Sequence, residues 1–348
     1  MKRKHIGMLP VFLALLVLFT ACAGRKSSGT DRGEGSDEMS ENEQPIVVTG
    51  DSYPLAVRDF VGDVTVLEKK PERVAVLSGT VLNVWYDVGG TAVCTVTISS
   101  TLKVVKEYED EIRALPSVGK QHLLSLEPIV AYEPDLIIAQ ENAQRESIVR
   151  LREMGYKVIV TCLRDLDDAL ATYRAFGKIV GNEERGIEKA DALKARYDAI
   201  RVKAPEHGKK VVILYLTSKK LQVKLDGSIA GSIAKDLGLN NIASGLSPVS
   251  GSAENAALDI EYLIEHQPDV ILVTSMISNG ESAAGVMKEY LESPAWQGVT
   301  AVQKGNIVYL PQEYFLYHAG PYFDESLRYM ASSVYPEIYG ETGEWYGK

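Results

Sequence analysis

A stretch of similar sequence occurs twice in the chain, at residues 125–139 and 259–273, and it constrains the fold more than any other feature. Each copy has a helix-capping residue first, a glutamate third, and then a Pro-Asp pair followed by four apolar residues. A short capped helix that ends before a proline and leads into a buried run is typical of a helix preceding a parallel strand. Two such units predict an α/β fold with two similar lobes, each built on a central parallel sheet.

The glutamates of the two copies, Glu127 and Glu261, each lie seven residues before the proline. The helix dipole alone favours a glutamate in the first turn of a helix, by about 0.3–1 kcal/mol. Because the glutamate recurs at the same register in both copies, we interpret the pair as equivalent surface positions with a shared role.

The N-terminal segment has the pattern of a targeting signal rather than of a folded domain. Basic residues at positions 2–4 precede an apolar run at 8–19, too short to span a bilayer comfortably, and Thr-Ala-Cys follows at 20–22. Small residues before a cysteine resemble the lipobox of bacterial lipoproteins, in which the cysteine carries the lipid. We therefore predict a lipoprotein signal peptide at residues 1–21 and lipidation of Cys22. An ordinary cleaved signal peptide or a short anchor helix is the alternative.

Residues 22–57 are predicted to form a flexible acidic tether. Between Ala23 and Gln44 almost all residues are polar, charged or glycine, so this part cannot bury enough apolar surface to fold. A lipidated cysteine followed by a tether predicts a protein anchored to the cell membrane on its extracytoplasmic face. That face borders either a periplasm or the exterior.

The chain has a formal net charge of −10, which becomes more negative once the basic residues of the signal are removed. An acidic surface without a basic patch argues against a nucleic acid partner. Besides Cys22 the chain has two cysteines, Cys94 and Cys162, both inside apolar runs. We expect buried free thiols, with a disulfide between them as the alternative for an exported protein.

Alternating strand-like and helix-like runs place the first lobe at residues 58–165. Residues 166–207 have helical periodicity and lie midway between the two copies of the repeat, so we predict one helical rod that joins the lobes. A pair of ordinary surface helices is the alternative. The strand pattern restarts at Lys210, and the second lobe occupies residues 208–348.

Polar residues follow several of the predicted strands, where ligands bind in open α/β sheets. The candidate ligand contacts are Thr80, Asn142, Ser275, Met276, Tyr314, Tyr317 and His318. The last three follow the final strand, and their phenol and imidazole groups suit ferric or haem iron. The alternative is that these rings pack the core of the second lobe, which we prefer for the neighbouring Phe315.

The sequence lacks the motifs of the common catalytic sites. It has no Walker loop, no nucleotide-binding glycine fingerprint and no nucleophile elbow, and its histidines are scattered. A bare-metal site needs several histidines and carboxylates together. We therefore expect no enzyme activity, no intrinsic cofactor and no metal bound by the protein alone. An extracytoplasmic hydrolase is the competing class, but no residue can be named as its nucleophile.

Several motifs occur in a fixed order along the chain. They are Pro-Glu-Arg-Val-Ala-Val-Leu-Ser at 71–78, the two copies of the repeat, Asp-Leu-Gly-Leu-Asn-Asn-Ile-Ala at 236–243, and Ala-Val-Gln-Lys-Gly-Asn-Ile-Val-Tyr at 301–309. With the lipobox and tether, they make the chain resemble the substrate-binding lipoproteins of ABC importers for iron–siderophores, haem and cobalamin. The resemblance covers nearly all of residues 60–335. It implies the class III periplasmic-binding-protein fold, in which a helical backbone joins two α/β lobes and ligand sits in the cleft between them.

The resemblance also implies a function, namely a receptor that delivers a small metal chelate to an ABC permease dimer with its ATPase. In this family the glutamates at the lobe tips dock onto arginines of the permease, and by motif position they are Glu127 and Glu261. Family members often carry a Thr-Glu pair after the first strand, whereas this chain has Gly-Thr-Val at 79–81.

The resemblance leaves several chelates open as the transported ligand. Because a tyrosine phenolate suits ferric iron better than cobalt already held in a corrin, we rank ferric siderophores first, haem second and cobalamin third. The ligand is thus expected to contain iron.

Overall fold

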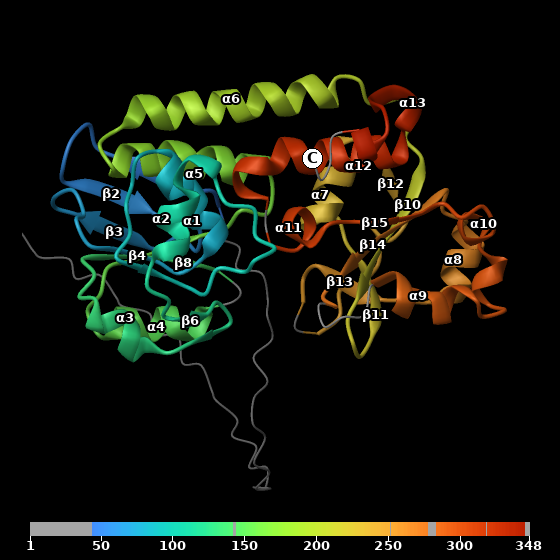
Figure 1. Cartoon of the computed structure of the whole chain (residues 1–348), viewed down its shortest axis with the longest axis horizontal. Coiled ribbons are helices and arrows are strands. Elements are labelled where there is room, and N and C mark those ends of the chain that lie inside the picture. Colours follow the sequence, from blue (N-terminus) through green and yellow to red (C-terminus); the bar gives the residue numbers. More distant parts are fainter. Residues whose placement is uncertain (1–43, 142–143, 251, 278–282, 318, 345–348) are drawn as a thin grey trace, which may run out of the picture. The chain divides into compact units, whose positions relative to one another are not determined.

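The computed structural model describes residues 44–141, 144–250, 252–277, 283–317 and 319–344. Most of this part consists of two separate sheets with helices packed against them (Figure 1). This arrangement confirms the predicted α/β class with two lobes. Within the described ranges no helix is long and apolar enough to cross a membrane.

The first sheet has four parallel strands, in the order β5 (Cys94–Thr95), β4 (Val74–Val76), β8 (Leu136–Gln140) and β9 (Val158–Thr161). All residues of these strands are buried, as expected for a parallel sheet covered on both faces. The other elements of this lobe are α1 (Gly79–Asp87), η1 (Lys106–Tyr108), α2 (Glu109–Ala114), β6 (Gly119–Lys120), β7 (Leu123–Leu124), α3 (Leu126–Ala131) and α4 (Arg145–Glu153).

The second sheet is mixed rather than purely parallel. Its order is β13 (Asn255–Ala257), β11 (Leu221–Lys224), β10 (Lys210–Leu216), β14 (Val270–Ser275) and β15 (Ile307–Tyr309), with β12 (Asn240–Asn241) also paired to β10. Strands β10, β12, β14 and β15 are parallel, whereas β11 runs in the opposite direction and pairs antiparallel with both β10 and β13. The turn between β10 and β11 is closed by a hydrogen bond from Thr217 N to Lys220 O (3.0 Å), and so short a connection permits only an antiparallel pair.

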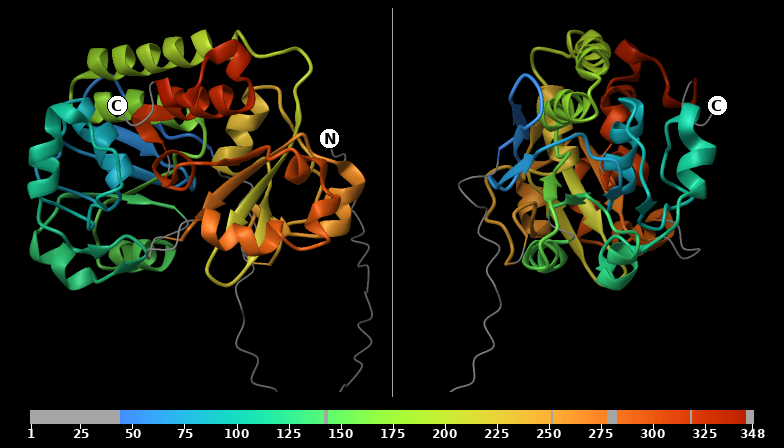
Figure 2. Two further views of the ribbon diagram at one scale, coloured as in Figure 1. Left: turned by 45° about the vertical axis from the view of Figure 1, so that its right-hand side comes forward. Right: turned by 90° about the vertical axis from the view of Figure 1, so that its left-hand side faces the viewer.

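Helices flank the second sheet on both sides (Figure 2). They are α7 (Ile229–Asp236), α8 (Ile260–His266), α9 (Ala283–Leu291), η2 (Trp296–Gly298), α10 (Thr300–Gln303), α11 (Gln312–Phe315), η3 (Gly320–Tyr322), α12 (Phe323–Val334), α13 (Pro336–Tyr339) and η4 (Thr342–Glu344).

The two copies of the repeat fold in the same way, as α3 followed by β8 and α8 followed by β14. The residue before each proline, Glu133 or Gln267, has a left-handed backbone with φ of 45° or 44°. This conformation ends each helix and turns the chain into the strand. The sequence repeat is therefore also a repeat of backbone structure.

The aspartate after each proline has the same role in both lobes. Asp135 accepts hydrogen bonds from the backbone N–H groups of Glu72 (2.8 Å) and Arg73 (3.0 Å), just before β4. Asp269 accepts one from the N–H of Lys210 (2.8 Å), the first residue of β10. Each carboxylate thus fixes the start of the strand beside it.

Residues 166–207 contain two helices, α5 (Leu166–Ile179) and α6 (Glu183–Arg201), so the prediction of one continuous rod is wrong. Gly181 has a left-handed backbone with φ of 72°, which ends α5 and reverses the chain. The two helices pack side by side, and α6 also contacts α12 (Figures 1 and 2). Helix α6 therefore links the first lobe to α12 of the second.

Close contact between α5 and α6 depends on two glycines, Gly177 and Gly186. A Cβ atom at Gly186 would lie 2.6 Å from Tyr173 O and 2.9 Å from Gly177 Cα, both backbone atoms. We expect Gly186→Ala to lower the free energy of unfolding by about 1–3 kcal/mol, because the helices must move apart. Gly227→Ala is the control, since no atom lies within 4 Å of a Cβ there. Urea unfolding should separate the two variants, and equal stabilities would contradict this packing.

A three-stranded antiparallel sheet begins the described chain, formed by β1 (Val47–Thr49), β2 (Leu55–Arg58) and β3 (Val64–Leu67). The tether predicted for residues 22–57 is therefore wrong from Gln44 onward. The reason is a short apolar alternation. Leu55 and Val57 are buried, and Val48 packs against the hydrophobic cluster that contains Val57. The earlier part of the predicted tether, together with the signal peptide and Cys22, lies outside the described residues.

One hydrophobic cluster extends through both lobes. It includes Val76 and Ile138 of the first sheet, Ile213 and Leu272 of the second, and Phe323 of α12. Trp85 also belongs to it, with its ring 5.2 Å from that of Phe176 in an edge-to-face arrangement. Cys94 and Cys162 are buried and free, as expected.

Candidate functional site

A cluster of amide side chains lies at the carboxyl ends of β4 and β8. Gln140, the last residue of β8, accepts hydrogen bonds at Oε1 from Ser78 Oγ (2.7 Å) and Gln121 Nε2 (2.8 Å). Its backbone N–H donates to Gln144 Oε1 (3.0 Å). Gln140 and Gln144 are buried and Gln121 is half-buried, so these amides are held in fixed orientations at the edge of the sheet.

A second group of polar residues lies at the carboxyl ends of β14 and β15. Gln312 Nε2 donates to Ser275 O (2.6 Å), and Tyr317 Oη donates to Gln312 Oε1 (3.3 Å). Ser275 itself is buried, and its hydroxyl accepts from the N–H of Ile277 (3.1 Å). Met276 is 48% exposed. Of these predicted contacts, Tyr317 and Met276 are the accessible ones.

The two groups meet, because Thr80 bridges the lobes. Its buried hydroxyl donates to Tyr317 O (2.6 Å), and a Cβ atom at Gly320 would lie 2.7 Å from its methyl group. The carboxyl edges of both sheets therefore face one region. We call Ser78, Gln121, Gln140, Gln144, Ser275, Gln312 and Tyr317 the strand-end site. Thr80 joins its two halves rather than lining an open surface.

A cation lies beside this site on the second lobe. Lys224 is 9% exposed in its side chain, pairs with Glu254 (3.0 Å) and lies 4.6 Å from the centre of the Tyr215 ring. Burial raises the pKa of Tyr215, and the nearby Glu254 and Tyr317 raise it further. Tyr215, Lys224 and Glu254 thus form one polar cluster.

The charge of Glu254 also reaches the first lobe. Burial is the main cause that raises the pKa of the Cys162 thiol, and the carboxylates of Asp168, Glu141 and Glu254 add to it. Cys162 directly follows β9, at the same edge of the first sheet as the amide cluster.

Tyr314 lies elsewhere, in the junction between α11 and α12. It is buried, and its hydroxyl donates to Glu325. Lys103 of the first lobe pairs with Glu325 and lies 3.5 Å from the same hydroxyl. Phe315 beside it is also buried in the hydrophobic cluster, as expected. This placement favours the packing role for Tyr314 over contact with a ligand.

The remaining predicted contacts, Asn142 and His318, lie outside the described residues. Among those that are described, no group of three or more His, Cys, Asp or Glu residues could hold a metal ion.

Sequence reasoning missed several residues of this region, namely Gln121, Gln144, Tyr215, Lys224 and Glu254. A signal for Gln140 was present, because it is the polar last residue of an apolar strand. Lys224 had a weaker signal in the alternation Leu-Gln-Val-Lys at 221–224. Gln121 and Glu254 come from loops that only the tertiary fold brings to the sheet edges.

Glu127 and Glu261 occupy equivalent places in α3 and α8, in the first turn of each helix. Both are exposed. Asp259 caps α8 by accepting a hydrogen bond from the Glu261 N–H (2.9 Å), whereas Ser125 makes no such bond in α3. Neither glutamate takes part in an ion pair found among the described residues, so both carboxylates remain available at the surface.

Comparisons with known proteins agree with this architecture. The sequence profile of the periplasmic binding protein family matches residues 74–314. The Fe(3+)-citrate-binding protein YfmC of Bacillus subtilis is 21% identical over 310 residues, which cover 88% of this chain and 89% of that protein. The Fe(3+) dicitrate-binding periplasmic protein FecB of Escherichia coli is 23% identical over 265 residues, covering 75% and 84%.

A solved structure has the same fold. The periplasmic haem-binding protein RhuT of Roseiflexus sp. RS-1, in its apo form, superposes with a TM-score of 0.62 and 26% identity, covering 76% of this chain and 98% of that one. Since the family profile spans most of the chain, we conclude that it belongs to the periplasmic binding protein family and is a solute receptor rather than an enzyme.

Proposed function

We propose that this receptor binds an iron chelate between its lobes and delivers it to an ABC permease. The observation that carries the proposal is the strand-end site, where the carboxyl edges of both sheets are joined through Thr80 and Tyr317. Oxygen-rich chelates present carboxylate, catecholate or hydroxamate oxygens at their surface. The amides of Gln121 and Gln140 and the hydroxyl of Tyr317 are hydrogen-bonding groups that suit such oxygens.

Two observations support a ferric chelate as the ligand, namely the side chains of Lys224 and Tyr215 and the ligands named for the relatives. Lys224 lies beside Tyr215 at low exposure, and its ammonium group can donate to an oxygen of a chelate as well as to Glu254. The relatives compared above are named for binding ferric citrate or haem, and all of these contain iron. We therefore rank ferric siderophores and related ferric chelates first, haem second and cobalamin third.

Isothermal titration of the purified protein tests this ranking, with ferric citrate, a ferric catecholate siderophore, haemin and cobalamin as ligands. We expect one ferric chelate to bind with one-to-one stoichiometry and to be recovered chemically unchanged. Binding of cobalamin alone would contradict the iron proposal. Release of a hydrolysed ligand would instead favour the competing hydrolase.

We further propose that the lipid on Cys22 anchors the receptor at the extracytoplasmic face. Lipid burial of about 0.8 kcal/mol per methylene holds such a protein at the membrane. Replacing the cysteine by serine removes the only thiol that can carry it at this position. In fractionated cells, Cys22→Ser should therefore move to the soluble fraction, whereas Cys94→Ser should stay with membranes. A Cys22→Ser protein that still sediments with membranes after a salt wash would overturn the assignment.

A further inference from the structure

The three-stranded sheet of β1, β2 and β3 lies at the edge of the first lobe that is away from the second lobe (Figure 1). Across its strands Val47 is opposite Arg58, Arg58 is opposite Val64, and Ala56 is opposite Val66. Residues directly opposite each other in an antiparallel pair share one face of the sheet, as do residues two apart in one strand. Because the alternate residues of β2 are buried, these five side chains lie on the outward face.

Three valines of this outward face are open to solvent. Val64 is 62% exposed, Val66 44% and Val47 43%. None of them belongs to a hydrophobic cluster of the described residues or packs against one. Exposed apolar side chains that occur singly are ordinary, but these three share one face of one sheet. We call Val47, Arg58, Val64 and Val66 the valine face.

Two cations accompany the valines. Arg58 is half-buried on β2, between Val47 and Val64. Lys157 is exposed and donates from Nζ to Val66 O (2.8 Å), which places its ammonium group beside β3. Neither cation takes part in an ion pair within the part of the chain that the structure describes. The valine face is therefore both apolar and positively charged.

The carboxylates of this segment lie before or after the strands rather than on the valine face. They are Asp51, Asp63 and Glu68, and Asp63 pairs with Arg152. At physiological ionic strength charges are screened over about 8 Å, so a partner at the valine face meets its local charge more than the net charge of −10.

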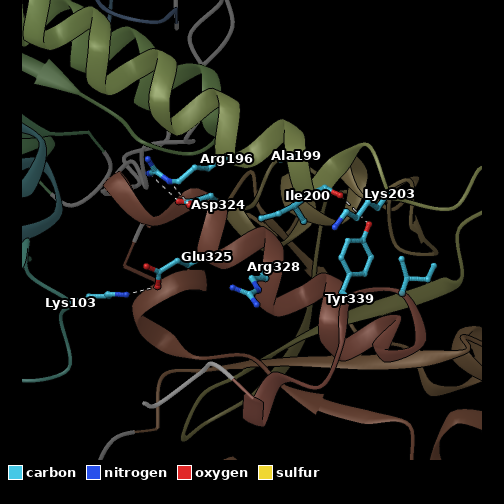
Figure 3. Close-up of a pocket in the computed structure, with 10 residues that line it drawn as sticks. Lys103, Arg196, Ala199, Ile200, Lys203, Asp324, Glu325, Arg328 and Tyr339 are labelled. Carbon is cyan, nitrogen blue, oxygen red and sulfur yellow. Dashed lines mark hydrogen bonds and ion pairs between the residues drawn. The ribbon is translucent and has the colours of Figure 1, made fainter.

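The cations in the cavity between α6, α12 and α13 have a different environment (Figure 3). There Arg196 pairs with Asp324 (2.6 Å), and Lys103 pairs with Glu325. An outside anion would compete with a carboxylate for each of these two cations. Arg58 and Lys157 have no such competitor among the described residues, so they are better placed to bind the anionic groups of a partner.

The place of this sheet in the chain favours a membrane as that partner. Residues 23–46 separate β1 from Cys22, the proposed lipid attachment site, and a segment of this length spans at most about 80 Å. The valine face thus belongs to the first described element after the proposed anchor. A second copy of the chain suits the face less well, because a symmetric pair would bring Arg58 and Lys157 of both copies together. Lipid phosphates carry the opposite charge.

We propose that the valine face lies on the phospholipid surface of the membrane, with the valines between the headgroups and Arg58 and Lys157 on lipid phosphates. Apolar side chains beside arginine and lysine are the combination that holds peripheral proteins at a bilayer surface. Guanidinium and ammonium groups bind phosphate through charge-assisted hydrogen bonds. The contact is independent of chelate binding, because it uses no residue of the strand-end site.

A fluorescent probe on the valine face tests the proposal in the lipidated protein, reconstituted in vesicles of phosphatidylcholine and phosphatidylglycerol in equal parts. Val64→Cys is labelled with a polarity-sensitive dye, since the native Cys94 and Cys162 are buried. We expect the emission of this probe to shift to the blue and to be quenched severalfold by spin-labelled lipid.

Val202→Cys is the matched control, because Val202 is 80% exposed and lies between Arg201 and Lys203 at the C-terminal end of α6. It combines a valine with two cations but lacks a sheet face, so its probe should stay in water and escape the quencher. Equal signals from the two probes would overturn the proposal.

The cations are tested in the Val64→Cys chain. Arg58→Gln with Lys157→Gln should reduce the quenching severalfold, whereas Arg201→Gln with Lys203→Gln removes the same charge and should leave it nearly unchanged. Arg58→Gln alone repeats the test should the double variant fail to fold. An equal loss in the control pair would contradict a role for the cations of the valine face.

A blue shift that disappears when the protein is diluted with more lipid would show that a second copy covers the face, and would overturn the membrane contact. Should the chain carry no lipid, vesicles are added to the soluble protein, and an unchanged Val64 probe at high lipid concentration would overturn the proposal. Affinity for the ferric chelate should be the same in all these variants. A failure of this contact is therefore distinguishable from a failure of the proposed receptor function.

Discussion

Replacing Glu127 and Glu261 together by lysine is expected to abolish uptake of the chelate while leaving its affinity for the receptor nearly unchanged. The two glutamates are exposed, lie one on each lobe and occupy the same place in a repeated structural unit. Exposed charges at the rim of an interface mainly set the orientation and rate of association with a partner. Reversing both would therefore prevent the receptor from docking on cationic residues of a permease without disturbing the strand-end site.

The control for this experiment is Glu153→Lys with Glu265→Lys, which makes the same charge change at exposed positions of α4 and α8. Uptake by whole cells and chelate affinity of the purified protein should be measured for both variants. Normal uptake by the Glu127/Glu261 variant would remove the docking role, leaving only the helix dipole to account for these residues. Loss of chelate affinity would place them in ligand binding instead.

The largest loss of stability is expected for Asp59→Ala. The Asp59 side chain is fully buried and accepts hydrogen bonds from the N–H groups of Val61 (3.2 Å), Asp63 (3.0 Å) and Val160 (3.0 Å). It also pairs with Arg152 at 2.7 Å. Removing it leaves buried donors and a partly buried cation without their acceptor, which typically costs about 3–5 kcal/mol.

Asp63→Ala is the matched control, because Asp63 pairs with the same Arg152 but is 61% exposed. Exposed ion pairs contribute about 0–1 kcal/mol. Urea unfolding should thus give a large decrease for Asp59→Ala and a small one for Asp63→Ala. Similar values for both would show that burial does not govern this cluster.

The fold could be predicted from the sequence where local chemistry repeats. The Pro-Asp units at residues 134–135 and 268–269 combine a helix end, a strand start and an aspartate that holds the neighbouring strand. These features lie within or beside the repeat and follow from its residue types. The repeated pattern therefore predicts both lobes. The same repeat singles out Glu127 and Glu261 as equivalent surface positions, and both are exposed.

The sequence-based predictions are wrong where helical periodicity continues through a break between two helices, and where a strand follows a polar stretch. Apolar residues keep helical spacing on both sides of Gly181, so α5 and α6 were predicted as one rod, although the left-handed backbone there reverses the chain. Strand β2 lies in a segment whose beginning is polar, and only Leu55 and Val57 signal it. Local propensity is weak in strands this short, and pairing with β3 decides their structure.

The candidate site was the least predictable part of the structure. Tyr314 and Tyr317 are three residues apart on one segment, and both carry a phenol. Their environments differ because Glu325 of α12 and Lys103 of the first lobe hold Tyr314 in the junction between α11 and α12. The amide of Gln121 reaches Gln140 only because a loop folds over the end of β8. Such contacts leave no periodic signal in the sequence.

Chelate affinity of Gln121→Ala and Tyr317→Phe, one variant from each lobe, tests most directly whether the strand-end site binds the ligand. Titration with the ferric chelate should give a loss of about 1–3 kcal/mol for each, roughly tenfold or more in dissociation constant. Tyr314→Phe, the control with the same chemical change, should bind as tightly as the unchanged protein. Unaltered affinity in both Gln121→Ala and Tyr317→Phe, or an equal loss in Tyr314→Phe, would contradict binding between the lobes at this site.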